Sequence, residues 1–365
     1  MDSACRALVV ERIQRRGPIT VAEFMDLALY APEVGYYARA ARRSGRTGDF
    51  FTSVDAGPVF GALLAEYFAA LWRTSGASGC DLVEAGAGNG RLTRDILDAA
   101  SRRDPDFYHA IAAHLVERSA PARAAHRVTL AAHTDRLAYS GEEMPDRIDG
   151  IVFANELLDA FPVHLVEMGD AGLLEVYVGL EAGRLVDGTG PLSDPALEGY
   201  LGHAGVSLER GARAEINLAA VDWVAGAAAR LRSGFLVLID YGYEAAELYS
   251  AARSQGTLAT YHRHLVDAPA SGAPMAGPAW LADPGGRDLT SHVDFTSVRR
   301  AAERAGLATL SVAAQTRFLL DILEGSPLVA ELSAPDRLAD RLALKTLLMP
   351  GGLGSTHTAM VFAKR

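Results

Sequence analysis

Cysteine and long apolar runs are both scarce in this sequence. The 365 residues contain two cysteines, Cys5 and Cys80, too few for a disulfide framework or a cysteine-rich zinc site. No apolar run approaches the roughly 18 residues that a membrane-spanning helix needs. The first six residues lack the apolar core of a secretory signal. We therefore expect a protein of a reducing, cytoplasmic compartment with no membrane partner.

An excess of positive charge is also missing. Lysine and arginine number 35 against 45 acidic residues, for a formal net charge of −10. This balance argues against nonspecific binding to nucleic acid, which needs a basic face. It is compatible with a cationic substrate, although most acidic proteins are simply soluble. The hydrophobic fraction of 49% supplies a sizeable core, and the length indicates two domains or one domain with large insertions.

Strand and helix patterns alternate over much of the chain after Asp81. Short apolar runs predict strands at 81–85, 112–117, 128–131, 148–154, 235–240, 307–313 and 358–363. Helical spacing predicts helices at 58–72, 92–100, 212–231 and 294–305. Such alternation predicts an α/β fold whose mostly parallel sheet is covered on both faces.

Several regions depart from this alternation. We expect residues 1–75 to form an N-terminal helical and loop region that contributes to the site. The core is then expected in 76–162, 211–242 and 294–365, with a β-hairpin insertion at 163–210, a lid-like insertion at 243–293 and a helical insertion at 316–348. The lid-like segment is rich in glycine, proline and alanine, and a stretch of that length in a compact enzyme usually serves binding.

The strongest local pattern is a glycine-rich loop between a predicted strand and a predicted helix. Glycines at 86, 88 and 90 let the backbone turn tightly and approach a ligand. A nicotinamide-type fingerprint would place its third glycine at position 91, which is Arg91. Glycine at alternate positions with Glu84 two residues before the first is the variant of methyltransferases. The loop predicts cofactor contacts from Glu84, Gly86, Ala87, Gly88 and Gly90; the alternative is a generic glycine-rich turn.

Acidic residues follow the next predicted strands. Glu117 ends the second strand, where a carboxylate can accept both hydroxyls of a ribose, and Ser119 adds a hydroxyl. The alternative for Glu117 is a solvent-exposed strand end. Asp135 follows the run at 128–131 and is a candidate for the adenine amino group.

A polar loop, Asn155 to Pro162, follows the buried strand at 148–154. Ligands of open α/β sheets bind beyond the carboxyl ends of the strands. Asn155, Glu156 and Asp159 are therefore expected to meet the reacting groups, and the alternative for Asn155 and Asp159 is helix capping.

A set of motifs spread along nearly the whole chain resembles the MidA-like methyltransferases. In order, the motifs are Leu29-Tyr30-Ala31-Pro32-Glu33-Val34-Gly35-Tyr36-Tyr37, Gly48-Asp49-Phe50-Phe51-Thr52-Ser53, Ala154-Asn155-Glu156 through Asp159-Ala160-Phe161-Pro162, Asp240-Tyr241-Gly242, Gly256-Thr257-Leu258 and Asp288-Leu289-Thr290-Ser291-His292-Val293-Asp294-Phe295. The chain departs from the family's pattern at Val54-Asp55, where Pro-Glu is usual, and at Ala87, where the family usually has proline.

The resemblance implies a class I, Rossmann-like core of seven strands with an N-terminal helical region and insertions. It implies S-adenosyl-L-methionine as the cofactor, with Gly48, Asp49, Thr52 and Ser53 lying over it and Asn155 and Glu156 contributing. The family includes a mitochondrial complex I assembly factor that methylates an arginine. An arginine acceptor needs carboxylates to fix its guanidinium and to take up a proton.

Candidate catalytic residues for that chemistry are Glu156, Asp159, Asp49 and Asn155. Tyr36, Tyr37, Tyr241 and His264 are candidates for the acceptor pocket, with packing as the alternative. His262, His264, His292 and Asp288 match no zinc spacing, so no metal is expected.

Three functions stay open at this point. The first is methylation of a nitrogen of a protein arginine, and the second is methylation of a small molecule or peptide product, because a fold does not fix its substrate. The third is a non-catalytic, cofactor-binding assembly protein. A protein or peptide substrate is the expected partner, and a homodimer is an open option.

Overall fold

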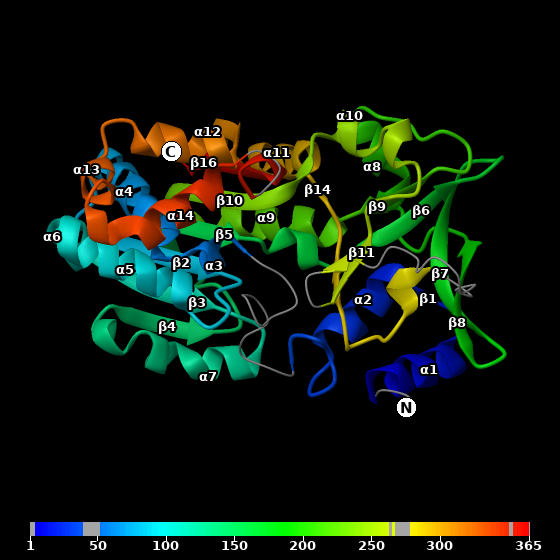
Figure 1. The fold of residues 1–365 in the computed structure, drawn as a ribbon. Coiled ribbons are helices and arrows are strands. Elements are labelled where there is room, and N and C mark those ends of the chain that lie inside the picture. Colours follow the sequence, from blue (N-terminus) through cyan, green and yellow to red (C-terminus); the bar gives the residue numbers. More distant parts are fainter. Residues whose placement is uncertain (1–3, 39–51, 263–264, 267–277, 350–352, 365) are drawn as a thin grey trace. The chain divides into compact units, whose positions relative to one another are not determined.

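The computed structural model describes residues 4–38, 52–262, 265–266, 278–349 and 353–364. The chain divides into two compact units, each built from three separate segments of sequence (Figure 1). The insertion unit comprises residues 1–40, 158–223 and 242–300, and the core unit comprises 41–157, 224–241 and 301–365. Among the helices that the structure describes, none is long and apolar enough to cross a membrane.

Seven strands of an eight-stranded sheet form the centre of the core unit, and the eighth, β14 (Val293–Asp294), pairs with Gly242 and Tyr243 at the end of β10. The seven strands run in the order β15-β16-β10-β5-β2-β3-β4, with bounds Ala308–Ala314, His357–Lys364, Leu231–Tyr243, Ile148–Asn155, Cys80–Ala85, Ile111–Val116 and Leu137–Gly141. Neighbours pair in parallel except β16, which is antiparallel to both β10 and β15. Six strands thus share one direction, and their carboxyl ends lie at one edge. This arrangement confirms the predicted Rossmann-like methyltransferase core.

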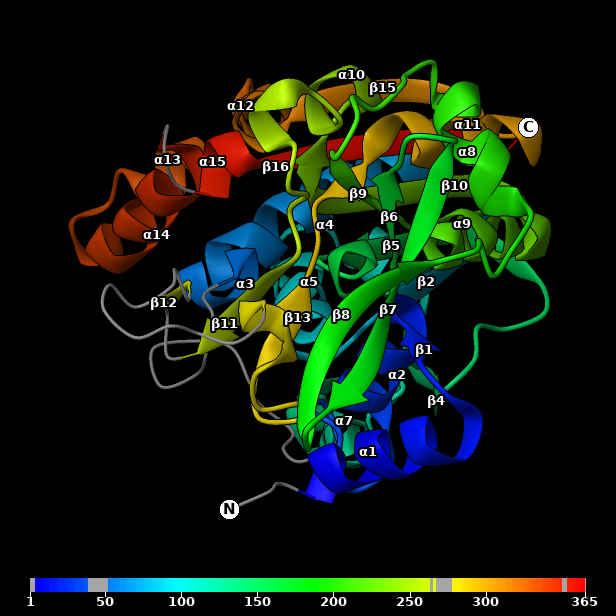
Figure 2. The same ribbon diagram turned by 90° about the vertical axis from the view of Figure 1, so that its right-hand side faces the viewer.

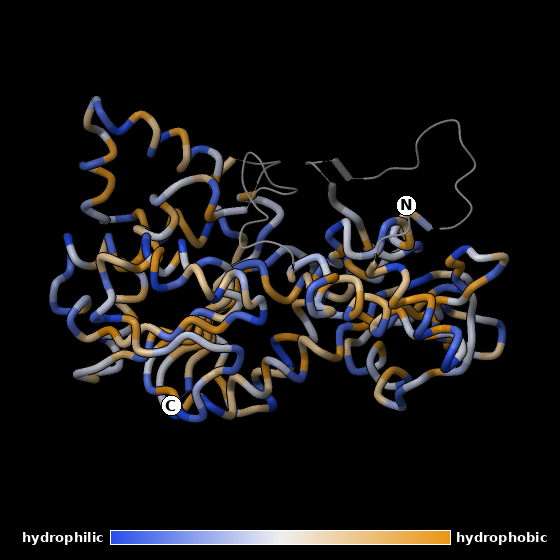
Figure 3. Tube along the Cα trace, turned by 90° about the horizontal axis from the view of Figure 1, so that it is seen from below, coloured by the Kyte–Doolittle hydropathy of each residue, from blue (hydrophilic) through white to orange (hydrophobic). Residues whose placement is uncertain are grey.

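Helices accompany this sheet in the core unit, and the longer ones, such as α4 and α5, bury an apolar stripe. The helices are α3 (Ser53–Ala56), α4 (Pro58–Ser75), α5 (Arg91–Arg103), α6 (Pro105–Ala110), α7 (Ala120–Thr129), α12 (Gln315–Leu323), α13 (Leu328–Leu332), α14 (Leu338–Leu348) and α15 (Leu353–Thr356), with 3-10 turns η1 (Ala131–His133) and η5 (Pro335–Arg337). Phe60, Leu63, Leu64 and Phe68 of α4 repeat at helical spacing and are fully buried in one cluster with the central strands. Figure 3 shows hydrophobic and hydrophilic stretches alternating along the chain.

Two predicted elements are wrong. Residues 128–131, expected as a strand, are the end of α7 and the start of η1, and Val128 is 78% exposed. The third strand is β4, farther along. Residues 212–231 were expected as one helix, but Arg213–Ile216 form β9, paired with β6, and only Leu218–Arg230 (α9) is helical. A short apolar run does not distinguish strand from helix by its spacing alone.

The insertion unit contains two antiparallel sheets (Figure 2). The first has the order β1-β7-β6-β9 with β8 beside β7, and the second has the order β12-β11-β13. Its elements are α1 (Ala4–Arg16), β1 (Ile19–Thr20), α2 (Val21–Tyr30), η2 (Leu158–Ala160), β6 (His164–Met168), β7 (Leu173–Glu181), β8 (Arg184–Gly190), α8 (Ala196–Ala204), β9, the start of α9, α10 (Ala245–Leu248), η3 (Ala251–Arg253), β11 (Ala259–His262), β12 (Leu265–Val266), η4 (Ala279–Leu281), β13 (Asp288–Thr290), β14 (Val293–Asp294) and most of α11 (Phe295–Arg304). Strands β6, β7 and β8 lie within residues 163–210, where β-hairpins were expected, and pair antiparallel.

A buried carboxylate fastens the segment after β10 within the insertion unit. Glu215 of β9 accepts hydrogen bonds from the backbone N–H of Thr257 at 2.8 Å and of Leu258 at 2.9 Å. A Cβ on Gly256 would stand 2.2 Å from Glu215 Oε1, so only glycine fits there. The Gly256-Thr257-Leu258 motif therefore has a structural explanation. The role of residues 1–75 as one region of the site stays a prediction, because described residues 4–38 and 52–75 belong to different units.

Candidate functional site

The glycine-rich loop joins β2 to α5 at the carboxyl edge of the sheet. Gly86, Gly88 and Gly90 have φ of 69°, 52° and 82°, a left-handed region that favours glycine. A Cβ would meet Leu157 at 2.9 Å from position 86 and Leu115 at 2.8 Å from position 90. At Gly88 a Cβ would meet nothing within 4 Å. Gly86 and Gly90 thus serve close packing, whereas Gly88 borders open space that a cofactor can fill.

Glu117, directly after β3, is held against this loop. Its carboxylate accepts the Gly88 N–H at 2.8 Å and the Ser119 N–H at 2.7 Å. Burial raises the pKa of Glu117, and the two backbone N–H groups oppose that rise. The structure therefore brings Gly88, Glu117 and Ser119 together, and the contact of Glu117 with a ribose stays a prediction.

His126 of α7 is a contact that the sequence did not indicate. Its Nε2 lies 2.8 Å from the Gly88 carbonyl and its Nδ1 lies 2.8 Å from Ser140 Oγ. Burial lowers the pKa of His126, so the ring is neutral near pH 7. Because the carbonyl only accepts, Nε2 donates to it and Nδ1 accepts from Ser140. His126 thus supports the glycine loop from α7. The residues that follow it, 128–131, had been expected to form a strand.

Glu84, predicted at the cofactor, has contacts of another kind in the structure. Its side chain is buried, with 4% of the residue exposed, and its Oε2 accepts hydrogen bonds from the backbone N–H and the hydroxyl of Thr93. Thr93 lies in the first turn of α5, whose N–H groups lack partners within the helix. Glu84 therefore fixes the helix that begins at the loop, and direct contact with the cofactor stays a prediction.

Glu84 also predicts a pH dependence of stability. Burial raises the pKa of Glu84 from 4.5 to about 8. The folded state keeps this proton where the unfolded chain releases it, so the stabilising contribution is complete below 4.5 and is lost as the pH rises through 8. We expect Glu84→Gln, which keeps an uncharged acceptor for Thr93, to gain up to about 4 kcal/mol over the wild type between about pH 5 and about pH 9. Denaturant unfolding at both pH values, with the exposed Glu198→Gln as control, checks this; parallel pH profiles of the two proteins would contradict it.

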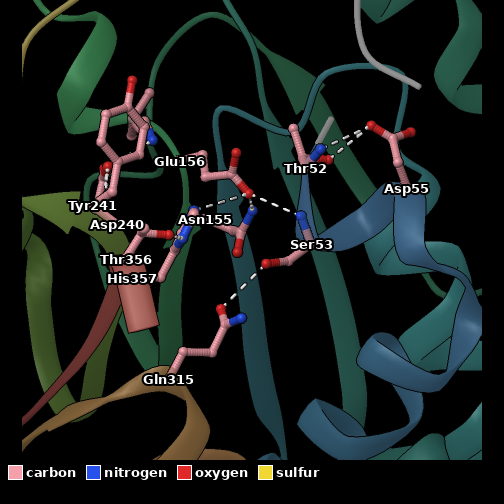
Figure 4. A network of polar contacts seen from close by, with 11 residues as sticks. Thr52, Ser53, Asp55, Asn155, Glu156, Asp240, Tyr241, Gln315, Thr356 and His357 are labelled. Carbon is pink, nitrogen blue, oxygen red and sulfur yellow. Dashed lines mark hydrogen bonds and ion pairs between the residues drawn. The ribbon is translucent and has the colours of Figure 1, made fainter. Parts of the chain in front are cut away.

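A second polar cluster lies where β5 ends, still within the core unit (Figure 4). Glu156 has φ of 52°, a strained conformation for a residue with a side chain. Its Oε1 accepts the Ser53 backbone N–H and the Asn155 Nδ2–H, each at 3.0 Å, and lies 3.7 Å from His357 Nε2. Its Oε2 has no hydrogen-bond partner among the described residues, and it points away from these contacts in Figure 4. Oε1 is thus held by the protein, whereas Oε2 is available to a ligand.

Asp240 of β10 fixes the backbone beside this carboxylate. It accepts the Leu157 N–H at 3.1 Å and the Tyr241 N–H at 2.8 Å, while the Glu156 N–H donates to the Ile239 carbonyl at 2.8 Å. The Asp240-Tyr241-Gly242 motif therefore holds the turn that carries Glu156. The Tyr241 ring packs against the His357 ring at 5.6 Å between centroids.

An ion pair joins the two clusters. Asp55 accepts from the N–H of Thr52 at 3.2 Å and from its hydroxyl at 3.0 Å, at the start of α3. Asp55 also pairs with Arg91, the first residue of α5. The turn that holds Ser53 against Glu156 is thereby tied to the end of the glycine loop. In the sequence, Arg91 was noted only because it occupies the position of the third glycine in a nicotinamide-type fingerprint.

The remaining predicted residues lie elsewhere. Gly48, Asp49 and His264 fall outside the described residues. Asp159 is a buried residue of η2 in the insertion unit. Within the described residues no group of histidine, cysteine and acidic side chains has the arrangement of a metal site.

Two of the three tyrosines of the predicted acceptor pocket, Tyr36 and Tyr37, belong to the insertion unit. Tyr36 is fully buried, and the Tyr37 hydroxyl donates to Asp288 at 3.0 Å. Burial, with the Asp288 carboxylate, raises the pKa of Tyr37 well above its usual value. These contacts are those of packing, and the pocket role stays a prediction.

Asp135 precedes β4 and pairs with Arg136, which removes the reason for assigning it to adenine.

The chain was compared with known families and structures. Residues 63–313 match the model of a family of S-adenosyl-L-methionine-dependent methyltransferases. The mouse mitochondrial protein arginine methyltransferase NDUFAF7 is 31% identical over 337 residues, which cover 84% of this chain and 71% of the relative. The human protein is 29% identical, covering 84% and 70%.

A solved structure is similar over nearly the full length. A protein from Burkholderia thailandensis, crystallised with S-adenosylhomocysteine, matches with a TM-score of 0.84 and 30% identity, covering 99% of this chain and 92% of that chain. The open space at Gly88 and the carboxylate of Glu117 fit the same cofactor. The sheet order, the glycine loop and these matches together place the chain in the MidA-like family of S-adenosyl-L-methionine-dependent methyltransferases.

Proposed function

We propose that this methyltransferase transfers its methyl group to a nitrogen of a protein arginine. The observation that carries the proposal is the Glu156 carboxylate, with Oε1 anchored and Oε2 open. A guanidinium is always protonated in water and presents a planar set of N–H donors. A fixed carboxylate can accept two of them, hold the plane of the group and take up a proton. The named relatives are protein arginine methyltransferases, which supports the same acceptor.

The bound cofactor supplies an activated methyl group on a positively charged sulfur. The protein must then align the acceptor nitrogen with the methyl carbon and exclude water. In the proposed reaction the nitrogen–methyl bond forms as the sulfur–methyl bond breaks, S-adenosylhomocysteine leaves, and the nitrogen loses one proton. Glu156 Oε2 is the atom placed to orient the nitrogen and to receive that proton. Tyr241 and His357 border the same carboxylate.

Transfer of a labelled methyl group tests the proposal. The enzyme is incubated with methyl-labelled S-adenosylmethionine and a cell lysate, and the products are digested and analysed by mass spectrometry. Label on arginine side chains of protein is the expected result. Label in a small molecule or a free peptide would show that the acceptor belongs to that class and is not a protein arginine. Absence of label would favour a cofactor-binding assembly protein. Glu156→Gln in the same lysate identifies label added by this site.

A further inference from the structure

The helical insertion before the last strand begins and ends at the Glu156 cluster. Strands β15 and β16 are antiparallel neighbours, and their pairing closes with Ala314 opposite Thr358. A hairpin of this kind needs only a short turn, yet residues 315–357 separate these two paired residues and include α12 to α15 where described. The residues at the two ends of that insertion are Gln315 and His357. Both side chains reach the Glu156 cluster in Figure 4.

Gln315 is polar at a position where packing alone would accept an apolar residue. It is the first residue of α12 and is 0% exposed. Its Oε1 accepts the Ser53 hydroxyl at 3.2 Å, and its Nε2 has no partner among the described residues. Whichever amide atom faces Ser53, the other stays unsatisfied. Burying an unsatisfied amide is unfavourable, so among the described residues the contact with Ser53 is the interaction that explains a glutamine here.

His357 reaches the same carboxylate from the other end. It is 5% exposed, and its Nδ1 lies 2.9 Å from the Thr356 hydroxyl. The opposite ring nitrogen, Nε2, therefore faces Glu156 Oε1 at 3.7 Å. The edge contact with Tyr241 sets the plane of the ring.

We propose that Gln315 and His357 are positioning residues that hold Glu156 for the acceptor. Gln315 acts through Ser53, whose hydroxyl it fixes and whose backbone N–H binds Glu156 Oε1. His357 acts by packing, because its Nε2 lies 3.7 Å from Oε1, beyond hydrogen-bond distance. The inference rests on the proposed function, in which Glu156 Oε2 binds the acceptor. Glu156 needs such support because its backbone is left-handed and its side chain has several rotatable bonds. Small losses of alignment in a reacting group lower the rate without weakening binding elsewhere.

A double-mutant cycle separates positioning from a general loss of stability. We expect Gln315→Leu and, independently, Ser53→Ala to lower turnover about tenfold, and His357→Phe to act in the same direction. In Gln315→Leu, affinity for S-adenosylhomocysteine, measured by calorimetry, stays unchanged. In the Glu156→Gln background the further tenfold loss disappears, because the reacting carboxylate is already gone. Gln14→Leu, on the exposed face of α1, is the matched control.

Additive losses in the two backgrounds, or unchanged turnover in both Gln315→Leu and Ser53→Ala, would overturn the proposal. If wild-type label enters an acceptor other than arginine, the proposed function fails, and the cycle is measured on that acceptor.

Hydrogen exchange gives a readout that needs no acceptor. In the protein loaded with S-adenosylhomocysteine, the Ser53 amide is expected to be protected by Glu156 Oε1 and to exchange faster in Glu156→Ala. Gln315→Leu should raise the Ser53 exchange rate toward that of Glu156→Ala, while Gln14→Leu leaves it at the wild-type rate. Wild-type protection in Gln315→Leu would remove the link through Ser53, whatever the enzyme methylates.

Discussion

Replacement of Glu156 by glutamine is expected to lower turnover at least about 100-fold and to leave affinity for the cofactor near that of the wild type. Glutamine keeps an oxygen that accepts the Ser53 N–H, so the cluster retains its shape. It lacks the negative charge that orients a guanidinium, and it cannot take up the proton that the nitrogen releases. The turnover number from labelled methyl transfer and the Kd of S-adenosylhomocysteine from calorimetry measure the two effects separately.

The exposed Glu198→Gln provides the control for the loss of one charge. A parallel fall in cofactor affinity and turnover would assign Glu156 to the cofactor instead of the acceptor. Turnover close to wild type would remove Glu156 from the chemistry and, with it, the observation behind an arginine acceptor.

Replacement of Glu117 by alanine is expected to weaken cofactor binding by about 30- to 100-fold, the effect of losing two charge-assisted hydrogen bonds to ribose hydroxyls. The same change leaves the Gly88 and Ser119 N–H groups without their acceptor, so the glycine loop loses a support as well. Glu117→Gln keeps an acceptor oxygen and should give an intermediate loss. Calorimetric titration with S-adenosylhomocysteine measures the affinity.

Glu209→Ala, on an exposed position of the insertion unit, controls for removal of a carboxylate. At saturating cofactor the Glu117 variants should recover most of the wild-type turnover, because Glu117 is expected to bind the cofactor and to take no part in methyl transfer. An unchanged Kd in Glu117→Ala would show that the carboxylate only braces the loop.

The mostly parallel sheet and the glycine loop could be predicted because their evidence is local. Gly86, Gly88 and Gly90 occupy consecutive alternate positions, and the left-handed backbone that they adopt is a property of glycine itself. Buried strands of a parallel sheet appear as short apolar runs, as at β5. The same reasoning failed at residues 128–131, where a short apolar run belongs to the end of a helix.

The supporting residues of the site could not be predicted, because their partners lie far away in the sequence. Gln315 and Ser53 are 262 positions apart, and no pattern around either one indicates the other. Asp55 was noted only as a departure from a family motif, and its pairing with Arg91 depends on how α3 meets α5. The assignment of residues 1–75 to one region shows the same limit, since adjacent segments joined different units.

The ion pair between Asp55 and Arg91 connects the short turn that carries Ser53 and Asp55 to both proposed sites, that of the cofactor and that of the acceptor. Ser53 in that turn holds the carboxylate proposed for the acceptor, and Asp55 holds the residue that ends the glycine loop. If a bound cofactor orders the glycine loop, we expect part of the same free energy to order the acceptor carboxylate, because the ion pair connects the two. By thermodynamic reciprocity the acceptor must tighten cofactor binding by the same factor. We therefore expect the binding of cofactor and of acceptor to be linked through the salt bridge between Asp55 and Arg91.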